Sequence, residues 1–207
     1  MHSVPRPRRI WVRTLAAAAP LALMLTGLSA CDRLMPSRSF KAVDITGADY
    51  ARRLDLPDLD GKLRTLDDFR GKLVVVFFGF TQCPDVCPTT LAKMSEVMKL
   101  LGDASGKVQV IFVTVDPERD TAQVLREYVG VFDPGFIALR GDAEQLKAVR
   151  KEFRLIVQKN AGATPTSYTI DHTAASYVFD TEGRPRLYVR HEATAADIAA
   201  DLRQLLQ

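Results

Sequence analysis

Two cysteines lie four positions apart in the middle of the chain, and each is followed by a proline. Cys83 and Cys87 belong to the run Thr81-Gln82-Cys83-Pro84-Asp85-Val86-Cys87-Pro88. A cysteine thiolate is both a nucleophile and a soft metal ligand. Three interpretations therefore compete for this pair: a structural disulfide, a redox-active dithiol and a metal site.

The spacing of the cysteines bears on all three interpretations. A disulfide across so short a loop would remove only about 2 kcal/mol of unfolded-chain entropy, so it would stabilise the fold little. Redox-active pairs typically have two residues between the cysteines. Here three residues separate them, and Gln82 precedes the first. A metal site needs a further ligand from elsewhere in the chain.

Histidine is the natural third ligand, and the chain has three. His2 lies in an N-terminal segment that we interpret below as a removable signal. His172 lies just before a late predicted hairpin, at a strand edge that can face the cysteine loop. A lone histidine is more often a polar surface or core residue, so the position of His172 makes it the candidate. His191 is predicted on the surface, at the opposite end of the domain.

Two thiolates and one imidazole form a soft set of three ligands. Structural zinc normally takes four protein ligands, whereas thiolates select Cu(I) and imidazole also suits Cu(II). Copper is therefore preferred, and zinc completed by water or by Asp85 stays open. Met94 and Met98 fall on the apolar stripe of a predicted helix, which favours a core role over thioether ligation.

The elements that must position these residues alternate between strands and helices. Two apolar runs, 73–80 and 108–115, predict strands buried on both faces. The other predicted elements are a hairpin in 54–66 around Asp60-Gly61, a helix after Pro88, a helix capped by Asp120 or Thr121, a strand at 136–139, a helix capped by Asp142, a hairpin of 177–179 with 186–189, and a helix starting at Thr194. This order predicts an α/β domain of thioredoxin-like topology, with an N-terminal β-hairpin and a mostly parallel central sheet flanked by helices.

The cysteine run leaves the C-terminal end of the first buried strand and enters a helix. Ligands of open α/β sheets bind at this edge. Pro88 suits the first helical position, which makes Cys87 the predicted helix cap. The positive end of the helix dipole favours thiolate over thiol there.

The N-terminus has the form of a bacterial export signal. Residues 1–13 are basic, 14–30 are uncharged and rich in Ala and Leu, and Cys31 follows two small residues, as in the lipobox of lipoproteins. We predict a lipoprotein signal peptide at 1–30, lipid modification of Cys31 and a membrane tether at 31–50. The alternative is an uncleaved anchor helix, although the apolar stretch is marginal for the roughly 20 residues that a span needs.

Both alternatives place the rest of the chain outside the cytoplasm. Asp32, directly after the lipid cysteine, resembles the signal for retention at the inner membrane. Thiols without protection form disulfides in such an oxidising compartment.

Composition excludes other classes of protein. The chain has 207 residues, 47% of them hydrophobic, which suits one globular domain. The first 30 residues contain four arginines and no acid, so the remainder has 24 basic and 25 acidic side chains. This nearly neutral body lacks the basic excess of a nucleic-acid-binding protein.

Three segments together resemble the Sco/SenC family. They are Gly79 to Leu91, Val113 to Thr121 and Asp171-His172-Thr173. Members of this family are membrane-tethered, thioredoxin-like copper chaperones for the binuclear copper centre of cytochrome c oxidase. The resemblance implies that Cys83, Cys87 and His172 hold one copper ion. Asp116 and Asp120 are expected to shape the loop after the second buried strand.

The resemblance implies metal handling without turnover of a small substrate. Oxidation to a Cys83-Cys87 disulfide would abolish copper binding. The implied partners are the copper-bearing subunit of cytochrome c oxidase, other periplasmic copper carriers and thiol reductants, met at the periplasmic face of the inner membrane. The alternative is a thiol-disulfide oxidoreductase that reduces the copper-ligand cysteines of the acceptor, with His172 tuning the thiolates. A peroxidase acting through a sulfenic acid is a third option.

Overall fold

The computed structural model describes residue 2 and residues 39–164 and 167–207. The predicted signal, apart from His2, and Cys31 lie outside the described residues. Among those described, no helix is long and apolar enough to cross a membrane. Residues from Ser39 onward form one compact unit.

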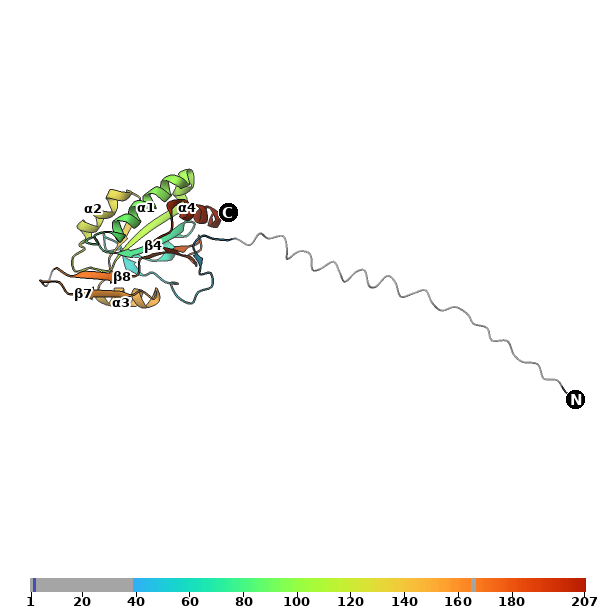
Figure 1. The fold of residues 1–207 in the computed structure, drawn as a ribbon, viewed down its shortest axis with the longest axis horizontal. Helices are drawn as coiled ribbons and strands as arrows, with labels where there is room; N and C mark the ends of the chain where they lie inside the picture. The colour runs from blue at the N-terminus through green and yellow to red at the C-terminus, as the bar shows by residue number, and fades with distance from the viewer. Residues whose placement is uncertain (1, 3–38, 165–166) are drawn as a thin grey trace. The chain divides into compact units, whose positions relative to one another are not determined.

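Two strands of large apolar residues form the centre of this unit (Figure 1). Every residue of β4 (Leu73–Gly79) is buried, and β5 (Val108–Thr114) runs parallel beside it. Side chains alternate between the two faces of a strand, so β4 contributes to a core cluster on each face of the sheet. The two long apolar runs of the sequence thus form the predicted buried strands.

The central sheet is mixed. Its order is β1-β10-β9-β4-β5-β6, and the remaining strands are β1 (Val43–Asp44), β6 (Ile137–Leu139), β9 (Ala175–Phe179) and β10 (Pro185–Arg190). The pairings from β4 to β6 are parallel, as predicted, but those from β1 to β4 are antiparallel. The predicted hairpin of β9 and β10 joins β4 directly, and β1 then covers the free edge of β10. The mostly parallel arrangement is therefore confined to one half of the sheet.

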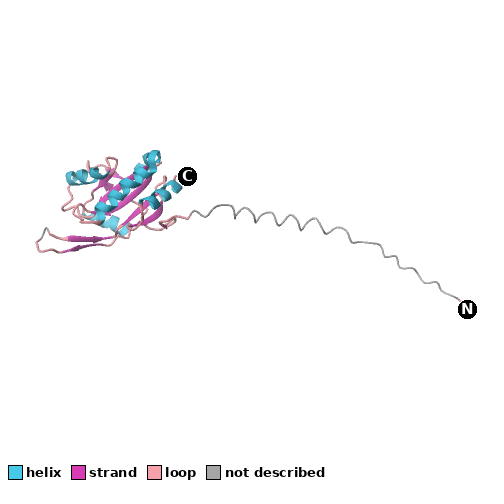
Figure 2. Cartoon of the chain, turned by 45° about the horizontal axis from the view of Figure 1, so that its top comes forward, coloured by secondary structure: helices cyan, strands magenta, loops and turns pink. Residues whose placement is uncertain are grey.

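Helices cover both faces of the sheet (Figures 1 and 2). They are α1 (Val86–Leu101), α2 (Ala122–Phe132), α3 (Ala143–Glu152) and α4 (Ala195–Leu205), with short 3₁₀ helices at Leu66–Phe69 and Gly102–Lys107. Buried residues of α1, α2 and α4 share one core cluster, and those of α3 belong to the other. In the described part of the chain, three helices therefore pack on one face and one on the opposite face.

Three helices begin at side-chain caps that the sequence predicts. Thr121, Asp142 and Thr194 each accept a hydrogen bond from a main-chain N–H in the first turn of α2, α3 and α4. Thr121, and not Asp120, is the cap of α2.

Two hairpins lie outside the central sheet. Strands β2 (Leu56–Pro57) and β3 (Leu63–Arg64) pair around the predicted Asp60-Gly61 turn. Strands β7 (Val157–Asn160) and β8 (Thr169–His172) form a second antiparallel hairpin, which no pattern in the sequence predicted. The second hairpin carries His172 and extends from the body on the side of α3 (Figure 1).

The described part of the predicted tether, residues 39–50, is more ordered than a tether requires. Strand β1 pairs with β10 inside the range predicted as tether. The buried carboxylate of Asp201 on α4 accepts hydrogen bonds from the main-chain N–H groups of Lys41 and Ala42 at 2.8–3.1 Å. Lys41 and Ala42 are thereby fixed to the body, a contact that no local sequence pattern indicates.

We expect Asp201→Ala to release the segment that precedes β1. Its loss leaves two main-chain donors without their acceptor, so the free energy of unfolding should fall by about 1–3 kcal/mol. Amide hydrogen exchange at Lys41 and Ala42 should accelerate, whereas Asp201→Asn, which keeps one acceptor oxygen, should have a smaller effect. Unchanged exchange at both amides would contradict this role of Asp201.

Candidate metal centre

The two cysteines lie where β4 passes into α1. The N–H of Cys83 donates to the carbonyl of Phe80 at 3.3 Å, which forms a tight turn after the strand. The N–H of Cys87 donates to the sulfur of Cys83 at 3.4 Å. Cys87 is fully buried and Cys83 is partly exposed. The loop therefore turns both sulfurs to one side, as the spacing predicts.

The start of α1 differs from the prediction. The helix begins at Val86, after Asp85, so Cys87 lies in the first turn and does not cap the helix. The N–H of Thr89 donates to the carbonyl of Asp85 at 3.1 Å and closes this turn. Pro88 is still compatible, because the first four N–H groups of a helix have no partner within it.

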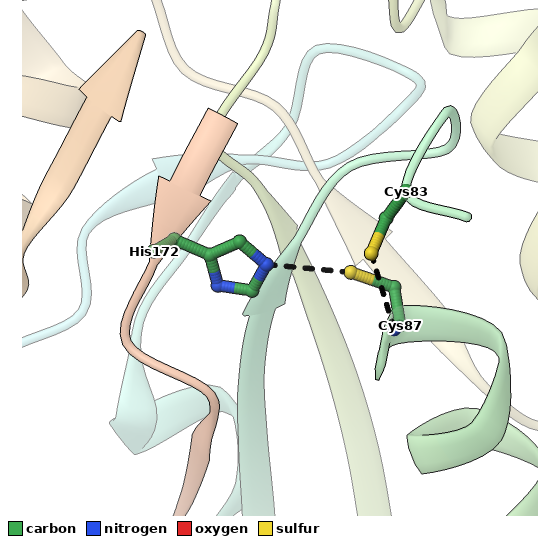
Figure 3. Close-up of side chains that lie close together, drawn as sticks. All are labelled: Cys83, Cys87 and His172. Atoms are coloured by element: carbon green, nitrogen blue, oxygen red, sulfur yellow. Dashed lines mark hydrogen bonds between the residues drawn. The ribbon is translucent and has the colours of Figure 1, made fainter. Parts of the chain in front are cut away.

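His172 reaches this pair from the end of β8 (Figure 3). Its Nε2 lies 3.4 Å from the sulfur of Cys87, and its Nδ1 lies 3.1 Å from the carbonyl oxygen of Thr173. A carbonyl only accepts, so Nδ1 carries the proton and donates to it. In the neutral ring the lone pair of Nε2 then points at the sulfur and accepts a hydrogen bond from the Cys87 thiol, and this is the tautomer that a metal ligand requires.

The three side chains form a compact group. One ligand atom from each of Cys83, Cys87 and His172 lies within 4.8 Å of the others. Within the described ranges, no acidic side chain joins them to make a larger group, and Asp85 is exposed. The residue types and spacing suit one metal ion with two sulfur ligands and one nitrogen ligand.

The surroundings of the group are apolar on one side and open on the other. The rings of Phe77 and Phe80 pack edge-on to His172, with centroids 6.2 and 5.9 Å away. A cleft of about 400 Å³ is lined by Phe80, Cys83 and His172, among others. A metal ion or a partner's ligand could reach the site through this cleft.

Burial changes the proton affinities of two members. It raises the pKa of the Cys87 thiol far above its usual range and lowers the pKa of His172. Desolvation in the core therefore acts against the predicted preference of Cys87 for the thiolate form. A bound metal must displace the proton of Cys87.

Gly79 is a further residue of the site, and no role was predicted for it. A Cβ atom at this position would lie 2.8 Å from the sulfur of Cys87 and 2.8 Å from the ring of Phe112. Only glycine lets the end of β4 lie so close to the sulfur. An isolated glycine within a run of large apolar residues is the available signal, since it often marks a close approach.

Two buried aspartates shape the loop between β5 and α2, as predicted. Asp120 accepts hydrogen bonds from the N–H and hydroxyl of Thr81 and from the hydroxyl of Thr114. Asp116 accepts from Arg119 at 2.5 Å and from the hydroxyl of Tyr168 at 2.6 Å. The first contact holds the cysteine loop and the second holds the hairpin that carries His172.

The remaining candidate ligands lie outside the group. Met94 is buried in the core and Met98 packs against it, which confirms their core role. His191 is partly buried at the same edge of the sheet as the cysteines, so its predicted position at the opposite end is wrong. Strand β10 runs parallel to β4, since two antiparallel steps through β9 separate them, and both end at this edge. His191 lies 3.1 Å from the hydroxyl of Thr90 on α1.

These features define a class of protein, an α/β domain with a Cys-Cys-His group that can hold one metal ion. The sequence model of the SCO1/SenC family matches residues 43–207, so the chain belongs to that family.

Individual relatives agree with this assignment. The SCO2-like protein of Rickettsia felis is 37% identical over 138 residues, which span 66% of each chain. The structure of Bradyrhizobium japonicum ScoI with copper bound has a TM-score of 0.69 and 38% identity, covering 75% of this chain and 99% of that one. Apo Sco1 from Thermus thermophilus has a TM-score of 0.73 and 35% identity, covering 83% and 99%. The predicted thioredoxin-like fold is thereby confirmed.

We expect Gly79→Ala to disturb the site through the sulfur of Cys87. The added methyl group must displace this sulfur or the Phe112 ring, so metal affinity should fall and the free energy of unfolding should drop by about 1–3 kcal/mol. Gly130→Ala is the matched control, because a Cβ there meets nothing within 4 Å and alanine favours the helix. Equal metal affinity in the two variants, measured by competition titration, would contradict this expectation.

Proposed function

We propose that this protein binds one copper ion through Cys83, Cys87 and His172 and delivers it to the binuclear copper centre of cytochrome c oxidase. The observation that carries this proposal is the convergence of two sulfurs and the unprotonated Nε2 of His172 beside an open cleft. Membership of the SCO1/SenC family supports the same acceptor.

The ligand set favours copper over zinc. Two thiolates suit Cu(I), and the imidazole also suits Cu(II), so the same three side chains can hold either oxidation state. Structural zinc sites normally have four protein ligands, and this group offers three. Copper bound in the related ScoI structure agrees with this choice.

Loading depends on the redox state of the two thiols. Oxidation to a disulfide consumes both sulfur ligands and leaves His172 alone. The acceptor takes copper by ligand exchange at the open side of the site, and no small substrate is turned over. Periplasmic copper carriers and thiol reductants are the further partners that this cycle needs.

The N-terminal pattern supports a location at the periplasmic face of the inner membrane. In this proposal residues 1–30 are removed, Cys31 carries the lipid and the short segment up to residue 38 links it to the body. The anchor keeps the copper site close to the membrane-embedded oxidase.

A second candidate is a thiol-disulfide oxidoreductase that reduces the copper-ligand cysteines of the acceptor. The N–H of Cys87 donates to the sulfur of Cys83, and Cys83 is the more exposed of the two. This is the arrangement of an attacking thiol followed by a buried resolving thiol.

We expect the reduced protein to bind one copper per chain and His172→Ala to weaken binding. Loss of an outer partner of a metal ligand already costs about 10–100-fold in affinity, so loss of a ligand should cost at least as much. Cys83→Ser and Cys87→Ser should abolish tight Cu(I) binding. The measurement is a competition titration with a chromophoric Cu(I) chelator under anaerobic conditions.

His191→Ala is the matched control, since it removes a histidine at the same edge of the sheet that lies outside the group. It should leave copper affinity unchanged. Indifference of copper affinity to His172, together with reduction of a model disulfide at an undiminished rate, would favour the oxidoreductase.

A further inference from the structure

Tyr168 is a buried tyrosine directly before β8, four residues ahead of His172. Its hydroxyl donates to Asp116 at 2.6 Å, and its carbonyl accepts a hydrogen bond from Arg119 at 2.9 Å. The charged groups of Arg119 and Lys159 lie 3.6 and 3.7 Å from the centre of its ring. One side chain thus makes a charge-assisted hydrogen bond and two cation-π contacts.

The contacts of Tyr168 with Asp116 and Arg119 join the hairpin to the central sheet, whereas Lys159 belongs to β7 of the same hairpin. Asp116 is buried just after β5, and its N–H donates to the hydroxyl of Thr114, the last residue of that strand. Arg119 also donates to Asp116 at 2.5 Å. Tyr168 is therefore attached to a loop that is itself fixed to the end of β5.

Among the described strands, β7 and β8 pair only with each other, so side-chain contacts must attach the hairpin to the body. Lys159 pairs with Glu118 and Arg150 donates to the carbonyl of Val157, and both contacts hold β7, whereas Tyr168 holds the start of β8. Strands β7 and β8 form a separate two-stranded sheet. Beyond His172, Thr173 exchanges two hydrogen bonds with Ile156. Ile156 and Thr173 flank the same hairpin. Their two hydrogen bonds therefore do not set the distance between the hairpin and the cysteine loop. The contacts of Tyr168 with Asp116 and Arg119 hold the hairpin to a different part of the chain.

We propose that Tyr168 is a positioning residue that places His172 over the two cysteines. It does not contact the metal, and it acts through the hairpin, with Asp116 and Arg119 as its anchor. The inference rests on the proposed copper site and adds a residue outside the ligand set. Cys83 and Cys87 are placed by β4 and α1, so Tyr168 affects one ligand of the three.

The test is a double-mutant cycle with Tyr168→Phe and His172→Ala. Tyr168→Phe keeps the ring and removes only the hydroxyl, so it should weaken Cu(I) affinity of the reduced protein about five- to tenfold. In the His172→Ala background the same substitution should change affinity by less than about twofold, because the ligand that it positions is gone. The thiol alkylation rate of Cys83, the partly exposed cysteine, should be equal in Tyr168→Phe and the wild type.

Tyr177→Phe is the matched control. Tyr177 is also buried, and its hydroxyl also donates one hydrogen bond, to the carbonyl of Phe153 at 2.8 Å, in the other core cluster. It should lose comparable stability without a change in copper affinity.

A second measurement needs no metal. Amide hydrogen exchange at Ile170 and His172 should accelerate in metal-free Tyr168→Phe and stay unchanged in Tyr177→Phe. If the wild type binds no copper, the proposed function fails, and unchanged hairpin exchange would then overturn the role of Tyr168 as well. If copper binds, equal affinity losses in both backgrounds, or an affinity unaffected by Tyr168→Phe, overturn the role of Tyr168 alone.

Discussion

The geometry of the site depends on one buried carboxylate. Asp120 is fully buried and accepts hydrogen bonds from Thr81, at the start of the cysteine loop, and from Thr114, at the end of β5. Burial raises the pKa of Asp120, so its charged form is costly there, and these donors offset part of the cost. The parallel register places Gly79 beside Thr114 at the ends of β4 and β5. By binding both Thr81 and Thr114, Asp120 holds the start of the cysteine loop beside the end of β5. The position of Cys83 thus follows from the sheet.

The central elements could be predicted because their signals are local. Seven consecutive buried residues in β4 leave an unmistakable apolar run, and the caps at Asp142 and Thr194 bond within their own first turn. The hairpin of β7 and β8 was not predicted because each strand has only four residues, and of these eight residues only Ile170 is buried. Strand β1 was not predicted because its two residues are exposed and leave no apolar pattern. Its position depends on pairing with β10.

In the site, too, features with a local sequence signal could be predicted, and features set by distant residues could not. The types and spacing of Cys83 and Cys87, with a histidine near a strand end, were enough to predict the three members that converge. Their protonation was not predictable, because the burial that raises the pKa of Cys87 comes from packing by residues distant in sequence. The predicted position of His191 was wrong because strand order decides at which edge of the sheet a strand ends, and no single segment of the sequence indicates that order. Gly79 could have been noticed, but the atom it accommodates belongs to α1.

The burial of Cys87 also limits which metals the site can hold. Its thiol must lose a proton in an apolar cluster, and this cost is the same for any ion that takes the sulfur as thiolate. An ion binds here only if the free energy of its bond to sulfur exceeds the cost of removing the proton. This condition excludes hard cations, which prefer oxygen ligands, and favours soft ones. His172 adds less of such a cost, because burial lowers the pKa of its ring, which favours the neutral form, and the carbonyl of Thr173 holds Nδ1 so that Nε2 faces the sulfur. The core that surrounds Cys87 therefore sets the minimum strength of the metal–sulfur bond, and the ligand types decide among the ions that exceed it.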